Sequence, residues 1–333
     1  VERNKVGGEI DVSDLPEVHA TGAGLKALCC CMAADGIEDL RRSCGGHGFL
    51  MSSGIAPLEA DFKGPNTTAE GDFVLLSLQT ARFLMKSLQA ARRGEPLSGL
   101  TQCLTPFKDP GFNPAVSGRE YLNLKGAVSV DDFLNYQYLL RLFELRTMIA
   151  IYRSGKALDQ SHAEGLSVDE ARNLHARLLY TTVKSHVRYF ILSKFAANLE
   201  TMEDPPCQIV LKKLCALFGV CDILEGEQWL GIIDSQEAEL AEAAARILGD
   251  SLRPDAIALT DSFDFPDRVL NSALGRKDGN VYEALLEAAR SSTMNVLSDG
   301  TKTEVPKFMR ELEPYLDLQL LKLANKRLPP SKL

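Results

Sequence analysis

The sequence predicts an all-α protein made of two consecutive helical bundles. Apolar residues recur at helical spacing along most of the chain, for example at Tyr136 and Leu140, and very little of the sequence alternates as a strand would. One stretch rich in proline, glycine and asparagine interrupts this pattern and is typical of an irregular connection. We therefore expect a first helical bundle over residues 1–97, an irregular linker over 98–128 and a second helical domain over 129–333.

Two long helices account for the first bundle. A serine and an aspartate shortly before Pro16 are typical of a capped helix start, and the apolar periodicity continues to about Ser43 before a pair of glycines ends it. The second helix should begin near Gly71 and continue until Gly94 and the proline that follows stop it.

The second domain has several helical segments with recognisable starts. Ser129 precedes two aspartates and Ser167 precedes an aspartate and a glutamate, so each hydroxyl can cap a helix whose first turn carries acids. The expected helices lie near residues 130–154, 167–200, 206–222, 226–249, 281–294 and 305–325.

Composition excludes several classes of protein. The 333 residues carry a net charge of −8, which offers no basic surface for nucleic acid, and no apolar run approaches the roughly 20 residues that span a bilayer. The eight cysteines lack the paired spacing of a zinc site and follow no secretory signal, so they are expected to be reduced thiols in an intracellular compartment. Because the chain starts at Val1 within a loop-like polar stretch, we expect it to be one part of a longer polypeptide.

The chain ends in a tripeptide that matches a C-terminal targeting signal. Ser331, Lys332 and Leu333 form the signal that a peroxisomal import receptor reads at a free C-terminus. The basic residues and two prolines before it would keep this tail extended for the receptor to bind. The alternative is a surface tail that no receptor binds. Of the two, we expect peroxisomal import.

Glu70 is the candidate catalytic residue. It stands on a glycine-bearing turn at the predicted start of the second helix, where a carboxylate beside a thioester substrate can remove an α-proton. Burial against substrate would raise its pKa toward working pH, and Gly71 would let the backbone approach a ligand closely. The alternative is a first-turn acid that only favours the helix dipole.

A glycine-rich turn and one arginine are further candidates. Gly45, Gly46 and Gly48 can bring backbone N–H groups close to phosphate oxygens, although the same pattern also fits a helix end followed by a tight turn. Arg82, inside the second helix, can pair with a phosphate or, as we expect, with an acid on a neighbouring helix. The histidines, including His47, show no metal spacing, and we predict no metal site.

Several blocks resemble one family. They are CGGHGF at 44–49, EG at 70–71, LQTARFLMK at 78–86, DSFDF at 261–265, the run at 270–290 and the terminal SKL. Together they span most of the chain and resemble the C-terminal half of the peroxisomal acyl-CoA oxidases. The resemblance implies an acyl-CoA dehydrogenase-like C-terminal bundle followed by the helical domain that oxidases add.

This resemblance also implies chemistry and partners. It implies an FAD-dependent enzyme that converts acyl-CoA to trans-2-enoyl-CoA and reduces O2 to H2O2 in peroxisomal fatty acid β-oxidation, with Glu70 as the base. It implies that Gly45 and Gly46 contact the flavin of the partner subunit in a homodimer, and that Gly71 and Asp72 lie at the cofactor. Phe73 stands where the family usually has an asparagine.

Three hypotheses follow for function. The first is the C-terminal part of a complete acyl-CoA oxidase. The second is a helical dimerisation or binding module of the peroxisome that has lost catalysis, which the retention of Glu70 with the glycine turn disfavours. The third is an acyl-CoA dehydrogenase that passes electrons to a carrier protein, which the helical block after residue 128 disfavours.

Overall fold

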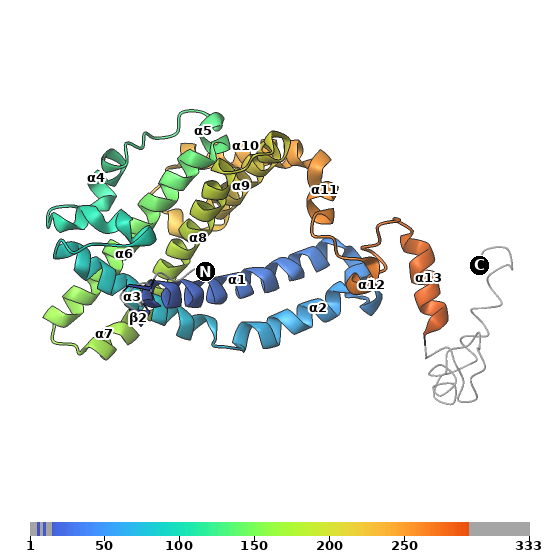
Figure 1. Ribbon diagram of the computed structural model, residues 1–333, viewed down its shortest axis with the longest axis horizontal. Coiled ribbons are helices and arrows are strands. Elements are labelled where there is room, and N and C mark those ends of the chain that lie inside the picture. The colour runs from blue at the N-terminus through green and yellow to red at the C-terminus, as the bar shows by residue number, and fades with distance from the viewer. Residues whose placement is uncertain (1–4, 7–8, 11–14, 293–333) are drawn as a thin grey trace, which may run out of the picture. The chain divides into compact units, whose positions relative to one another are not determined.

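The structure is a computed structural model that describes residues 5–6, 9–10 and 15–292. Its regular structure is helical apart from one antiparallel pair of two-residue strands, β1 (Lys5–Val6) and β2 (Glu9–Ile10), which confirms the predicted all-α class (Figure 1). The α-helices are α1 (Leu15–Ser43), α2 (Ile55–Asp61), α3 (Phe73–Arg92), α4 (Pro114–Tyr121), α5 (Val130–Leu134), α6 (Tyr136–Ala163), α7 (Val168–Leu174), α8 (Ala176–Glu200), α9 (Pro205–Glu225), α10 (Ser235–Leu252), α11 (Ala256–Asp261), α12 (Asp267–Leu270) and α13 (Val281–Ser291). Shorter 3₁₀ and π turns are η1 (Gly45–Phe49), η2 (Met51–Ser53), η3 (Phe62–Asn66), η4 (Gly99–Lys108), η5 (Glu227–Trp229) and η6 (Arg253–Asp255).

The chain forms two compact units, which are described separately. Among the described residues, the large unit combines 5–6, 9–10 and 15–36 with 61–263, and the small unit combines 37–60 with 264–292, so that α1 contributes to both. The bounds of these units differ from those of the two domains predicted from the sequence. The predicted division at residues 98–128 stays a prediction.

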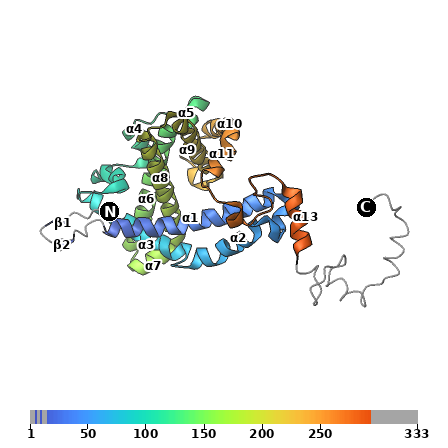
Figure 2. The same cartoon turned by 45° about the vertical axis from the view of Figure 1, so that its right-hand side comes forward.

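The core of the large unit lies around α6. This helix packs along α8 and also contacts α3 and α9, and α10 packs on α9 (Figure 2). Leu139, Leu142, Phe143 and Met148 of α6 are completely buried, because their apolar side chains face neighbours on several sides. The core therefore fixes α3 and α8, the two helices that flank the candidate catalytic turn.

Several predicted helices match the structure and others differ for physical reasons. The helix from Pro16 to Ser43 is confirmed as α1, and Ser167 caps α7 in a reciprocal capping box with Glu170. The linker 98–128 is less irregular than predicted, because it holds η4 and α4 and buries Phe107 at 4% exposure. The helix predicted near 305–325 lies outside the described residues.

The helix predicted from residue 226 begins later than expected. Residues 226–234 instead fold into a turn around Trp229, whose indole N–H donates to the backbone oxygen of Asp222 at 3.1 Å. Asp234 then caps α10 by accepting from the backbone N–H of Glu237 at 2.8 Å. Because the buried ring of Trp229 occupies this segment, α10 begins about two turns later in the sequence than predicted.

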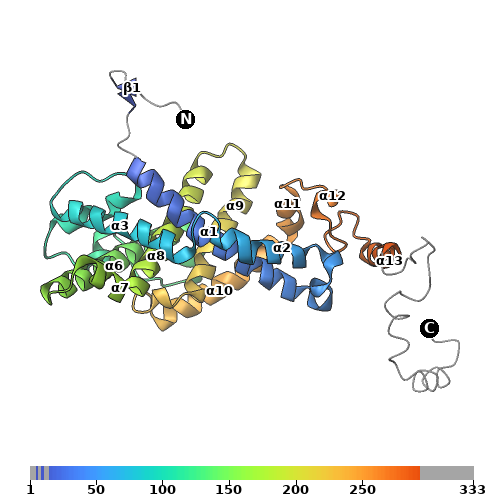
Figure 3. The same ribbon diagram turned by 90° about the horizontal axis from the view of Figure 1, so that it is seen from below.

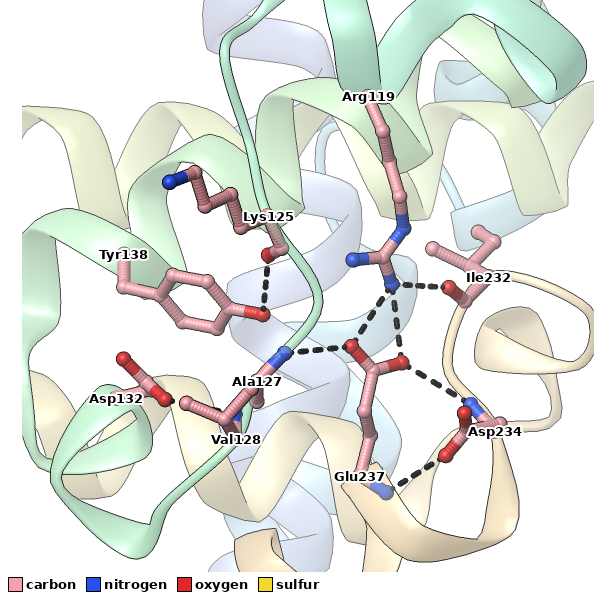
Figure 4. A network of polar contacts seen from close by, with 9 residues as sticks. All are labelled: Arg119, Lys125, Ala127, Val128, Asp132, Tyr138, Ile232, Asp234 and Glu237. Carbon is pink, nitrogen blue, oxygen red and sulfur yellow. Dashed lines mark hydrogen bonds and ion pairs between the residues drawn. The ribbon is translucent and has the colours of Figure 1, made fainter.

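Glu237 connects the linker to α10 (Figure 4). Its carboxylate, 5% exposed, accepts from the Arg119 guanidinium at 3.0 and 3.1 Å and from the backbone N–H groups of Ala127 and Asp234, each at 3.1 Å. Arg119 also donates to the backbone oxygen of Ile232 at 2.7 Å. A buried carboxylate with this many donors is well compensated, so the network holds the linker against the second helical block.

His186 on α8 makes the stability of the large unit depend on pH. Burial lowers the pKa of its imidazole from 6.5 to about 4. Since the unfolded chain binds more protons between these values, stability falls as the pH drops from 6.5 toward 4, by about 2 kcal/mol at pH 5. We expect the difference in free energy of unfolding between the wild type and His186→Gln to depend on pH. The wild type should lose about 2 kcal/mol relative to the variant between pH 7 and pH 5. Equal advantages at the two pH values in denaturant titrations would contradict this expectation.

Candidate functional site

Glu70 occupies a sharp turn between η3 and α3 in the large unit. Its φ angle of +65° lies in the left-handed region that side chains rarely adopt, and Gly71 follows with a φ of +114°. Asp72 then begins the helix as its N-cap, with the carboxylate accepting from the backbone N–H of Leu75 at 2.9 Å. The helix start therefore holds the Glu70 backbone in a conformation that costs about 1–3 kcal/mol.

A lysine of α1 forms hydrogen bonds with the backbone of this turn. The Lys26 ammonium donates to the backbone oxygen of Gly71 at 2.7 Å and to that of Thr67 at 3.4 Å. Lys26 lies 45 residues from Gly71 in the sequence, so no local pattern could have revealed the contact. The turn is thereby attached to α1 as well as to α3.

Phe73, just after the turn, packs against α8. Its ring packs edge-on against Tyr180 of α8 at 5.7 Å between centroids, and the Lys184 ammonium lies 5.0 Å from its ring centroid. Phe73 also contacts the small apolar cluster of Ala23, Ala27 and Leu76. The Phe73 ring thus connects the turn to α8, a role that sequence reasoning missed.

Glycine is required at position 71 by packing as well as by conformation. A Cβ placed there would lie 3.0 Å from the side chain of Leu76, in addition to the strain of the positive φ. Glu70, by contrast, is exposed. The turn therefore presents a carboxylate outward on a backbone that packing holds in place, which is the arrangement a positioned base requires.

Gly45 and Gly46 open the turn η1 of the small unit. Gly45 has a φ of +60°, and no atom comes within 4 Å of a Cβ built at either glycine. The first N–H groups of a helical turn have no partner inside it, so an open surface here allows phosphate or ring atoms to contact the backbone. The two glycines fit the predicted contact with a flavin dinucleotide.

Gly48 has a structural function instead. A Cβ at this position would lie 2.0 Å from the backbone oxygen of Arg41, at the end of α1. We expect Gly48→Ala to destabilise the protein by about 1–3 kcal/mol through overpacking. Gly46→Ala is the matched control, since nothing stands near its Cβ, and it should leave the thermal midpoint unchanged. A midpoint equal in the two variants would contradict the assignment.

The predicted site residues fall into three groups. Glu70, Gly71 and Asp72 are consecutive at the start of α3 in the large unit, and Asp72 already uses one carboxylate oxygen to cap that helix. Gly45 and Gly46 belong to the small unit. Ser331, Lys332 and Leu333 lie outside the described residues. Their functional roles remain predictions.

The described part of the chain holds neither a membrane-spanning helix nor a metal-binding cluster. Each of its helices is too short or too polar to span a bilayer. No cluster of three or more histidine, cysteine, aspartate or glutamate side chains with the arrangement of a metal site occurs among residues 5–6, 9–10 and 15–292.

Comparisons with known proteins agree on one family. The family model for acyl-CoA oxidase matches residues 135–314, and that for the acyl-CoA oxidase C-alpha1 domain matches residues 2–85. The chain is 35% identical to peroxisomal acyl-coenzyme A oxidase 1 of Rattus norvegicus, an alignment that covers 92% of this chain and 45% of the rat protein.

Solved structures show the same likeness. Arabidopsis thaliana acyl-CoA oxidase 1 matches with a TM-score of 0.78 and 32% identity, covering 94% of this chain and 44% of that one. Caenorhabditis elegans acyl-CoA oxidase-2, solved with FAD, ascaroside-CoA and ATP, matches with a TM-score of 0.75 and 26% identity, over 94% of this chain and 44% of that one. The chain thus spans less than half the length of these relatives.

The chain belongs to the acyl-CoA oxidase family, because the model of that family matches more than half of its residues. Acyl-CoA oxidases are flavoenzymes, and the neighbour from Caenorhabditis elegans was solved with FAD bound.

Proposed function

We propose that this chain forms the C-terminal part of an FAD-dependent acyl-CoA oxidase. The reaction is acyl-CoA plus O2 giving trans-2-enoyl-CoA plus H2O2. The observation that carries the proposal is the outward-facing carboxylate of Glu70 on a left-handed turn, in a chain of the acyl-CoA oxidase family. A strained, non-glycine residue that the surrounding structure holds in place is characteristic of functional positions.

Glu70 supplies the base of this reaction. Its carboxylate would take the α-proton of the thioester, and FAD, when bound, would supply the acceptor for the hydride of the β-carbon and the route of two electrons to O2. Lys26 holds the backbone of the turn through the Gly71 oxygen at 2.7 Å, so that the carboxylate keeps one position during proton transfer. A substrate and cofactor that cover the exposed side of Glu70 would exclude water from the carboxylate.

The small unit contributes to the cofactor site of this proposal. Gly45 and Gly46 bring backbone N–H groups to the flavin dinucleotide, in keeping with the open space at both positions. Gly71 lets the backbone at the start of α3 approach the cofactor closely, and Asp72 beside it lies at the cofactor while capping the helix. The oxidase acts as a homodimer whose flavin sites use this loop from the partner subunit.

The same proposal places the protein in the peroxisome. The matched rat relative is named peroxisomal, and the terminal Ser331, Lys332 and Leu333 provide the import signal. Removal of these three residues should leave the protein outside peroxisomes without changing its activity in the purified state.

Peroxide release tests the proposed function directly. The protein that carries this chain is incubated with FAD and a saturated acyl-CoA in air, and H2O2 is measured with and without an artificial electron acceptor. Acyl-CoA-dependent peroxide in amounts equal to the enoyl-CoA formed would support the oxidase. Enoyl-CoA that forms only when the acceptor is present would indicate a dehydrogenase, and no product under either condition would favour the non-catalytic binding module.

A further inference from the structure

The large unit contains a groove that the proposed catalysis does not use. It lies between α3, α6 and α7, three helices that Figure 3 shows close together, and it has a volume of about 610 Å³. This volume lies within the range of small-molecule sites, about 300–1,000 Å³. Its lining begins at Leu75 and follows α3 as far as Arg92, away from the turn that carries Glu70.

The groove combines an apolar floor with a rim of charged side chains. Leu88 and Leu179 are buried at its base, and Leu78, Met85 and Leu158 line it while partly exposed. The apolar part of this lining favours a flexible hydrocarbon chain, because each methylene that leaves water adds to binding.

The rim charges are paired with one exception. Arg92 binds Asp159 at 2.8 Å, and Arg172 lies 3.5 Å from Asp169. Arg82 has no ion pair with any residue that the structure describes, although the sequence had led us to expect one with an acid on a neighbouring helix. Its exposed guanidinium is therefore the positive group of the rim that remains available to an anion.

We propose that this groove binds a free straight-chain fatty carboxylate, with the hydrocarbon on the leucine floor and the carboxylate on Arg82. The charge of the ligand complements Arg82, the lining arginine that has no ion pair among the described residues, and its hydrocarbon suits the leucine and methionine side chains on either side of Arg82. The site is separate from the proposed catalytic turn and takes an acid rather than a thioester.

A series of ligands tests both parts of this site. Calorimetric titration of the protein with octanoate, decanoate and dodecanoate should show affinity that rises by up to about fourfold per added methylene. Decanol should bind more weakly than decanoate, because it lacks the charge. An affinity that does not change with chain length, or no binding of any of the three acids, would overturn the proposal.

Three variants locate the binding. Arg82→Gln should weaken decanoate by about tenfold and leave decanol unchanged, because only the charged hydrogen bond is lost. Lys86→Gln is the matched control, since Lys86 is an exposed cation on the same helix that does not line the groove. Val168→Glu, at the first residue of α7, adds an acid that the helix start tolerates and should also weaken decanoate alone.

The variants also separate this site from the catalytic one. Glu70→Gln should leave decanoate binding unchanged, so failure of the proposed oxidase activity would not affect the result. If decanoate binds Arg82→Gln, Lys86→Gln and the wild type equally well, the groove is not the site of the carboxylate and the proposal is wrong.

Discussion

Glu70→Gln is expected to lower acyl-CoA-dependent peroxide release by about 10²–10⁴-fold, the usual contribution of a positioned general base. The amide keeps the size and shape of the carboxylate but cannot accept the α-proton. The turn itself should survive, because Lys26 binds the backbone oxygen of Gly71 and Asp72 caps α3 independently of the Glu70 side chain. Initial rates at saturating acyl-CoA, with the flavin content of both proteins measured, give the comparison.

A second substitution at the same position separates catalysis from structure. Glycine adopts the φ of +65° without strain, so Glu70→Gly should be as stable as the wild type or about 1 kcal/mol more stable while losing the same activity. Glu120→Gln, an exposed acid on α4, serves as the control and should keep full activity. Unchanged peroxide release by Glu70→Gln would show that another group is the base.

The sequence predicted the helical class and the ends of several helices because these depend on local patterns. Apolar periodicity and capping residues act over a few neighbours, and α1 and the capping box at Ser167 follow from them directly. The segment 98–128 was predicted less well. Its prolines and glycines suggested an irregular loop, but burial of Leu104 and Phe107 organises it into η4 against the core.

The candidate site was predictable in its residues and not in its geometry. Glu70 and Gly71 could be proposed from the turn and the resemblance, whereas the contacts of Lys26, Tyr180 and Lys184 join segments far apart in the sequence. The left-handed backbone of Glu70 also has no sequence signal, because a glutamate is an unfavourable residue for that conformation. Tertiary packing imposes it.

Asp222→Ala is expected to destabilise the protein by about 3–5 kcal/mol, the typical cost of removing one partner from a buried ion pair. Asp222 on α9 is paired with the Arg146 guanidinium of α6 and, at 2.5 Å, with Arg188 of α8. Arg146 is only 1% exposed and lies between the rings of Phe143 and Trp229, 4.4 and 4.3 Å from their centroids. Without the carboxylate, a charge that water cannot reach would be left without its counter-ion.

The indole of Trp229 adds to this cost. Its N–H donates to both the backbone oxygen and the carboxylate of Asp222, at 3.1 and 3.2 Å, so the substitution also loosens the turn that precedes α10. Asp250→Ala, an exposed acid on α10, is the matched control and should change the free energy of unfolding by less than about 0.5 kcal/mol.

Denaturant titration of wild type, Asp222→Ala and Asp222→Asn measures the effect and identifies its cause. Asparagine keeps the hydrogen bond to the indole but removes the charge, so its loss of stability should be smaller than that of alanine if both contacts contribute. The double variant Arg146→Met with Asp222→Leu removes both charges, and should be more stable than Asp222→Ala because no unpaired cation remains beside Phe143 and Trp229. A double variant less stable than Asp222→Ala would show that packing around the two side chains, and not the uncompensated charge, accounts for the loss.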